Sequence, residues 1–171
     1  MEKNGLLAAL SSLGAKIPFD LEIVVAGGSA LLLQDFTHRG TTDCDTIDAS
    51  PRLATVQRYI EEVAEEMRLS PTWLNDAAKS FAEVLPADAP DSFEDVGQYG
   101  RLRVRHIGRL NLILMKVTGL RPVDKDDLDA MKPTRQELEY VRDELARVGK
   151  LNPAIALRVD LYLKQGGRTR K

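Results

Sequence analysis

Cysteine and histidine are scarce in this chain of 171 residues. Their scarcity excludes a disulfide-stabilised protein and a protein built around a cysteine- or histidine-rich metal site. Cys44 is the single cysteine, so the chain can form neither an internal disulfide nor a cysteine-rich metal site. The 2 histidines, His38 and His106, lack the spacing of a histidine metal motif. We expect both to act as hydrogen-bonding residues.

Long apolar runs are also missing. The longest nearly continuous stretch covers residues 23–33, and Gly27, Gly28 and Ser29 interrupt it. A membrane span needs about 20 apolar residues, and the first residues show no cleavable signal pattern. Apolar residues nevertheless make up 43% of the chain, enough for a folded core. We therefore expect a cytoplasmic protein with no membrane partner.

The net charge of −2 conceals two halves of opposite sign. Residues 1–100 carry 7 basic and 17 acidic side chains, whereas residues 101–171 carry 17 basic and 9 acidic ones. The halves have net charges of −10 and +8. This pattern is typical either of solvated faces that cluster by chance or of an acidic metal site beside a basic surface for polyanions.

Hydrophobic periodicity predicts alternating helices and strands. Strands are expected over residues 21–26, 41–47 and 102–107. Helices are expected over residues 6–13, 30–36, 51–67, 72–84, 110–117, 124–131, 135–148 and 153–163. The order indicates an α/β (α+β) protein with a small mixed sheet flanked by helices and a helical C-terminal part. We expect a core over residues 1–131 and, packed on it, a helical segment over 132–171 that ends in a basic tail.

The first motif with chemical meaning is Gly27-Gly28-Ser29, which lies between a predicted strand and a predicted helix. Glycines let a backbone approach a ligand closely, and free N–H groups at a helix start favour phosphate. Many strand–helix turns need glycine only for packing, so the motif alone leaves both interpretations open.

The second motif is Asp43-Cys44-Asp45 in the next predicted strand. Side chains alternate along a strand, so the two carboxylates point the same way, about 7 Å apart at Cα. Such a pair repels itself and favours a cation such as Mg²⁺, which prefers oxygen ligands and substrate phosphates. Two solvated aspartates on an exposed strand are the alternative.

Together the two motifs resemble the minimal nucleotidyltransferase core of the DNA polymerase β superfamily. That core has a strand, Gly-Gly or Gly-Ser at a helix start, and Asp-x-Asp in the following strand. Arg39-Gly40-Thr41-Thr42 is also similar to the Arg-x-Thr that often precedes the aspartates. A later block, Lys116, Gly119, Arg121, Asp124 and Asp127, resembles AbiEii-like nucleotidyltransferases, which include toxin components of toxin–antitoxin and phage-defence systems.

The resemblance implies a nucleotidyltransferase fold and transfer of a nucleotide from an NTP. It implies that Asp43 and Asp45 hold Mg²⁺, as one ion or two, and that Asp124 and Asp127 complete the catalytic set. The nucleotide-binding residues that it implies are Gly27, Gly28, Ser29, Arg39, Lys116 and Arg121. The acceptor would be an RNA of tRNA-like kind, a protein or a small molecule, and a cognate antitoxin or toxin is a further expected partner.

The chain departs from the superfamily at the strand that usually supplies a third carboxylate. The matching strand, residues 102–107, carries no carboxylate and places Arg101, Arg103 and Arg105 on one face. These arginines either contact an acceptor or phosphate, or form an exposed face that acidic elements cover. Asp124 or Asp127 would replace the missing carboxylate, with Asp91, Glu94 and Asp95 as weaker candidates. The alternatives to catalysis are a non-catalytic module of a toxin–antitoxin pair that binds nucleotide or nucleic acid, and a nucleic-acid-binding protein that uses the basic half.

Overall fold

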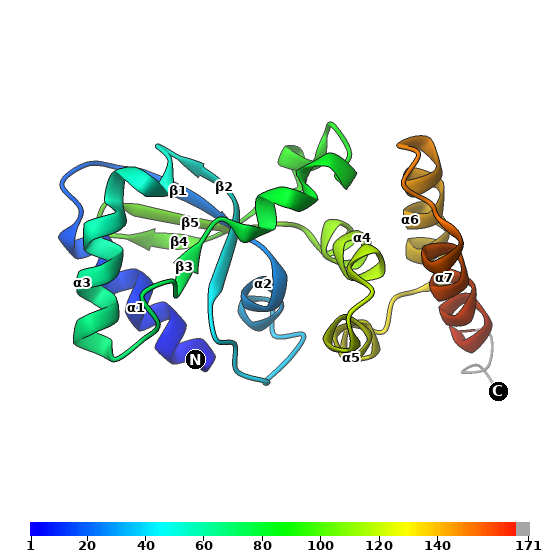
Figure 1. Ribbon diagram of the computed structural model, residues 1–171, viewed down its shortest axis with the longest axis horizontal. Helices are drawn as coiled ribbons and strands as arrows, with labels where there is room; N and C mark the ends of the chain where they lie inside the picture. Colours follow the sequence, from blue (N-terminus) through cyan, green and yellow to red (C-terminus); the bar gives the residue numbers. More distant parts are fainter. Residues whose placement is uncertain (167–171) are drawn as a thin grey trace.

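The computed structural model, which describes residues 1–166, contains a five-stranded mixed sheet and a helical C-terminal part (Figure 1). The strands are β1 (Leu21–Val25), β2 (Cys44–Ser50), β3 (Leu74–Asn75), β4 (Glu94–Tyr99) and β5 (Leu102–His106). The α-helices are α1 (Lys3–Lys16), α2 (Gly27–Leu33), α3 (Gln57–Met67), α4 (Arg109–Gly119), α5 (Pro122–Met131), α6 (Arg135–Arg147) and α7 (Pro153–Gly166). The 3₁₀ helices are η1 (Leu53–Val56), η2 (Ala77–Val84) and η3 (Ala89–Ser92). The expected basic tail over residues 167–171 lies outside the described residues.

The strand order is β3-β2-β1-β5-β4. β1 runs parallel to β5 and antiparallel to β2, and Val25 at the end of β1 pairs with Thr46 near the start of β2. Because the two strands are antiparallel, the first residues of β2 lie beside the end of β1, where α2 begins. The topology therefore brings the glycine motif and the aspartate motif together.

The two faces of the sheet differ in polarity, as the alternation in residues 102–107 predicts. On one face Ile23 and Val104 are paired and buried beneath α1 and α3. On the other face Glu22 is paired with Arg103, which is exposed. One face thus belongs to the hydrophobic core, and the other is charged.

Helix α4 is buried along almost its whole length, and α2, α5, α6 and α7 all pack against it. From α6, Leu138, Val141 and Leu145 are buried in the same core. In Figure 1, α4 and α5 lie between the sheet and the pair α6 and α7. Within residues 1–166, no helix combines the length and the apolar content that crossing a membrane requires. The expectation of a mixed sheet with a helical C-terminal part is confirmed.

Several expected boundaries are wrong, each for a physical reason. The strand expected over 41–47 begins at Cys44, because the backbone of Thr41 pairs with that of Met1. The helix expected over 30–36 begins at Gly27, so the glycines start the helix instead of preceding it. The helix expected over 72–84 is β3 followed by η2, because the Trp73 carbonyl accepts a hydrogen bond from Cys44 N.

Strand β4 was not expected at all. Its residues are mostly polar or partly exposed, it forms the edge of the sheet, and its pairing with β5 shifts register between Asp95 and Gly97. A polar, irregular edge strand has no apolar alternation for a pattern to detect.

Candidate active site

Gly27 is the residue at which β1 turns into α2, and its conformation requires glycine. Its φ of +61° lies in the left-handed region, and a Cβ there would lie 3.2 Å from Oδ2 of Asp45. A side chain at this position would therefore be strained and would press on the carboxylate. The glycine motif and the aspartate motif are in direct contact, as their resemblance to a nucleotidyltransferase core implies.

The polar side chains near the turn hold the segment that carries Asp43. Ser29 Oγ donates a hydrogen bond of 2.6 Å to the carbonyl oxygen of Asp43, and Thr41 Oγ1 donates one of 2.9 Å to the same oxygen. Ser29 is buried, so in this structure its hydroxyl positions the aspartate segment rather than facing the cavity. Cys44 between the aspartates is also buried, and burial raises its thiol pKa to about 12, which excludes a thiolate nucleophile here.

Asp45 is the aspartate that lines the cavity. It pairs with Asn75 across β2 and β3. Burial and the negative charge of Asp43 raise the pKa of Asp45, while Asn75, Arg121 and Lys116 act in the opposite direction. The two carboxylates are therefore close enough to repel each other, and a bound cation would relieve that repulsion.

The cationic side of the site is built on α4 and α5. Lys116 is buried, and its Nζ lies 3.2 Å from Asp124 Oδ1 and 2.7 Å from Asp127 Oδ2. Arg39, from the segment before β2, lies 2.5 Å from Asp127 Oδ1. Arg121 Nε donates to Asp124 Oδ2 at 2.9 Å. Three cations thus surround two buried carboxylates, and Lys116 and Arg121 also act on Asp45 across the cavity.

The spacing of the last block has a local explanation. Asp124 caps the start of α5 by accepting a hydrogen bond of 3.1 Å from Arg121 N. A Cβ at Gly119 would lie 2.3 Å from Asp124 Oδ2, so only glycine leaves room for that carboxylate. Burial by itself raises the pKa of Asp124, but its hydrogen bonds from Arg121 and the charge of Lys116 lower the pKa overall. Asp124 is thus held as a carboxylate.

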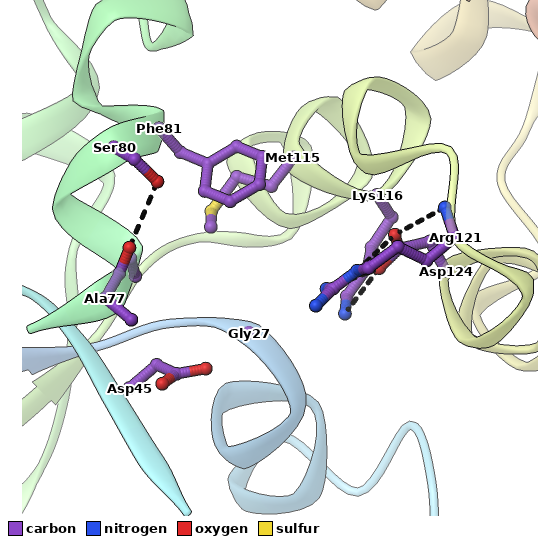
Figure 2. Close-up of a pocket in the computed structure, with 10 residues that line it drawn as sticks. Gly27, Asp45, Ala77, Ser80, Phe81, Met115, Lys116, Arg121 and Asp124 are labelled. Carbon is purple, nitrogen blue, oxygen red and sulfur yellow. Dashed lines mark hydrogen bonds and ion pairs between the residues drawn. The ribbon is translucent and has the colours of Figure 1, made fainter. Parts of the chain in front are cut away.

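These groups face a cavity of about 250 Å³ (Figure 2). Its lining residues are Gly27, Asp45, Ala77, Ala78, Ser80, Phe81, Met115, Lys116, Arg121 and Asp124. Figure 2 shows Asp45 on one side, with Lys116 and Arg121 on the other. The cavity is therefore lined by two acidic groups, Asp45 and Asp124, by two basic groups and by an apolar wall.

The other predicted site residues lie elsewhere. Gly28, Ser29, Asp43, Arg39 and Asp127 do not line this cavity. Asp127 contacts the lining residue Lys116, and Arg39 is linked to the cavity through Asp127. In the part of the chain that the structure describes, no group of three or more histidine, cysteine or acidic side chains could hold a metal. Asp124 and Asp127, expected in the catalytic set, form ion pairs with Lys116, and Asp127 also pairs with Arg39.

The arginine strip of β5 also lies away from the cavity. Arg103 contacts Glu22 at 3.3 Å and Asp95 at 3.1 Å, and Arg105 contacts Glu22 at 3.6 Å. Arg101 lies 3.7 Å from Asp20. Carboxylates on neighbouring segments therefore partly offset the charge of these arginines.

Sequence reasoning missed the residues of η2, and it missed Asn75, which pairs with Asp45 and so links β2 to the start of η2. Ala77, Ser80 and Phe81 fall within the helix expected over residues 72–84, and Met115 falls within the one expected over 110–117, and none of the four was expected at the site. No motif marks them, because pairing between β2 and the two-residue strand β3 is what places η2 at the cavity.

A glycine turn against a carboxylate pair, with cations across the cavity, defines the class of nucleotidyltransferases. A family model described as "Nucleotidyltransferase of unknown function (DUF6036)" matches residues 8–143. The chain belongs to this family. No curated protein and no solved structure matches it significantly.

Proposed function

We propose that the protein transfers a nucleoside monophosphate from an NTP to an acceptor hydroxyl, with Asp43 and Asp45 at the reacting phosphate. The observation that carries this proposal is the cavity, in which Asp45 lies opposite Lys116 and Arg121. Both charges suit a triphosphate that arrives with a divalent cation, because the carboxylates take the cation and the basic groups take the phosphate oxygens.

Lys116 and Arg121 are the residues that we assign to the phosphates. Asp124 contacts both of them, at 3.2 and 2.9 Å, and so fixes the direction in which they point. A cation bound at Asp45 would offset that carboxylate and leave Lys116 and Arg121 free to attract an anion at this wall. Arg39 contributes from outside the cavity, through its ion pair with Asp127.

The donor set fits a divalent cation that also takes ligands from substrate and water. Asp43 and Asp45 are two carboxylate oxygen donors, and burial together with the negative charge of Asp43 raises the pKa of Asp45. When bound there, Mg²⁺ supplies charge neutralisation for the triphosphate and for the leaving pyrophosphate. The described residues offer two carboxylates for this role, so the remaining ligands must come from phosphate oxygens and water.

The chain's own contribution is positioning and electrostatic stabilisation. In the proposed reaction the acceptor oxygen bonds to the α-phosphorus, and the bond from that phosphorus to the pyrophosphate oxygen breaks. The acceptor proton passes to solvent. Lys116 and Arg121 stabilise the charge that develops on the pyrophosphate, while Gly27 lets the substrate approach the backbone beside Asp45.

The finer relationship to AbiEii-like proteins is part of the proposal. It is supported by the way in which Lys116, Gly119, Arg121, Asp124 and Asp127 form one contiguous cluster at the cavity. We retain the acceptor classes of RNA, protein and small molecule, and a cognate toxin or antitoxin partner, as candidates.

The direct test incubates the protein with each labelled NTP, Mg²⁺, and total RNA or candidate proteins. We expect transfer by the wild type, with a loss of about 100-fold or more in Asp43→Asn and Asp45→Asn, because each variant removes half of the cation's protein ligands. Asp48→Asn is the matched control, since Asp48 is an exposed residue of the same strand. Transfer that persists in both site variants would refute the assignment. NTP binding without transfer would indicate the non-catalytic module.

A further inference from the structure

One side of the cavity is apolar, and phosphate transfer leaves it without a role. Phe81 and Met115 lie together there, Phe81 from η2 and Met115 from α4, and Ala77 and Ala78 continue the wall (Figure 2). The same cavity contains Asp45 and Lys116. A ligand with its phosphates at the charged groups would therefore have an apolar surface beside the rest of its structure.

The wall is held firmly relative to Asp45. Thr46 Oγ1 donates to the carbonyl oxygen of Asn75 at 3.1 Å, and Asn75 Oδ1 accepts from Ala77 N at 2.8 Å. These bonds tie the start of η2 to the strand that carries Asp45. Met115 belongs to the same helix as Lys116. The apolar wall and the charged groups thus share two rigid supports, so one ligand can contact both at once.

We propose that Phe81 and Met115 bind the nucleobase of the NTP, a proposal that rests on the function proposed above. An aromatic side chain stacks on any base, because every base has a π-face. A thioether beside the ring supplies a polarizable, adaptable surface. The base would contact Phe81 while the phosphates reach Lys116 and Arg121.

The chemistry of this wall predicts weak base selectivity. Ser80 is the polar residue of η2 that lines the cavity. Its hydroxyl already donates a hydrogen bond to the Ala77 carbonyl oxygen at 3.0 Å. Stacking, rather than hydrogen bonding to base edges, then dominates recognition. ATP and GTP should bind with similar affinities, and more tightly than CTP and UTP, because a purine covers more of the ring.

The test compares ligands with and without a base. Full-length protein with Mg²⁺ is titrated calorimetrically with ATP and with inorganic tripolyphosphate. We expect Phe81→Ala to weaken ATP binding by about 5- to 150-fold, the range for loss of one base–aromatic stack, and to leave tripolyphosphate binding unchanged. Phe81→Leu keeps apolar bulk without the ring and should also weaken ATP binding alone. Phe93→Ala is the matched control, because Phe93 is a partly buried phenylalanine outside the cavity.

Each outcome decides between the two proposals. If the wild type binds ATP no more tightly than tripolyphosphate, or if both Phe81 variants keep wild-type ATP affinity, the base-binding wall is refuted and the phosphate site stands. If neither ligand binds the wild type, the proposed function fails, and the wall with it. Thermal unfolding of each variant shows whether it is folded, and Phe81→Leu preserves the test should Phe81→Ala not fold.

Discussion

At the scale of single residues, two glycines show what the site demands of its backbone. Gly27 and Gly149 have φ values of +61° and +67°, so both occupy a conformation that side chains disfavour. Their surroundings differ. A Cβ at Gly27 would meet Asp45 Oδ2 at 3.2 Å, whereas a Cβ at Gly149 would meet nothing within 4 Å. The pair therefore separates the conformational cost of a side chain from its effect on the site.

We predict that Gly27→Ala and Gly149→Ala each lower the free energy of unfolding by about 1–2 kcal/mol, the cost of a left-handed residue that has a Cβ. Gly27→Ala alone should also displace the Asp45 carboxylate and lower transfer activity by about 10- to 100-fold. Urea unfolding and a labelled-NTP assay measure the two effects. Equal activity of the two variants would contradict the contact between Gly27 and Asp45.

At the scale of elements, the start of α6 determines how that helix attaches to α4. Thr134 and Glu137 form a reciprocal capping box. Arg109, at the start of α4, contacts Glu137 Oε1 at 2.6 Å. Burial opposes ionisation of Glu137, but its bonds to Arg109 and to Thr134 N outweigh burial, so its pKa lies below the usual value. One carboxylate therefore caps α6 and links two helices.

A carboxyl group whose pKa is lowered by folding stabilises the fold above its unfolded pKa, about 4.3 for glutamate. We predict that Glu137→Gln destabilises the protein at pH 7 by about 1–3 kcal/mol. The difference from the wild type should shrink as the pH falls from about 4.3 through the lower folded pKa. Glu139→Gln on the same helix is the control, because its side chain is 42% exposed and should matter little. Urea titrations between pH 3 and 7 test this, and a pH-independent difference would contradict it.

At the scale of the whole molecule, the cavity lies where the acidic and basic halves of the chain meet. The sheet part supplies Asp45 and Gly27, and the helical part supplies Lys116, Arg121 and Asp124. Few charged side chains from the two oppositely charged halves thus line the cavity, while Arg103 and Arg105 lie outside it and pair with Glu22. The helices beyond residue 131 stabilise the basic side, because α6 and α7 both pack on α4.

We predict that a chain ending at Met131 loses its cooperative unfolding transition. Removal of α6 and α7 would expose the apolar surface of α4 and discard the buried residues Leu138, Val141, Leu145, Ile155 and Val159. At about 1.5–3 kcal/mol for each large buried side chain, this loss is comparable to the whole stability of a typical domain. Circular dichroism and size-exclusion chromatography measure the outcome. A monomeric fragment with the wild-type melting temperature would show that residues 1–131 fold on their own.

Local pattern was enough to predict β1, which is an apolar run rich in β-branched residues, and β5, in which apolar and polar residues alternate. It failed at Thr72–Val84 and at β4. In the first case, pairing with β2 overrides helical periodicity, and in the second, a polar edge strand has no periodicity to detect. Within the site, Gly27, Asp45, Lys116, Arg121 and Asp124 were predicted and line one cavity, whereas Phe81 and Met115 were not predicted.

The sequence by itself determined the class of the protein. Gly27-Gly28-Ser29, the aspartate pair and the Lys116 block are short motifs, and their spacing along the chain can be recognised without knowledge of the fold. Tertiary structure decided which charges meet around the last motif. The sequence places Asp124 and Asp127 in the catalytic set, and folding surrounds them with Lys116, Arg39 and Arg121. The physical reason is that the electrostatic role of a carboxylate depends on which opposite charges lie within a few ångströms. Arg121 is close to Asp124 in sequence, whereas Arg39 is 88 positions from Asp127 and reaches it only through the fold.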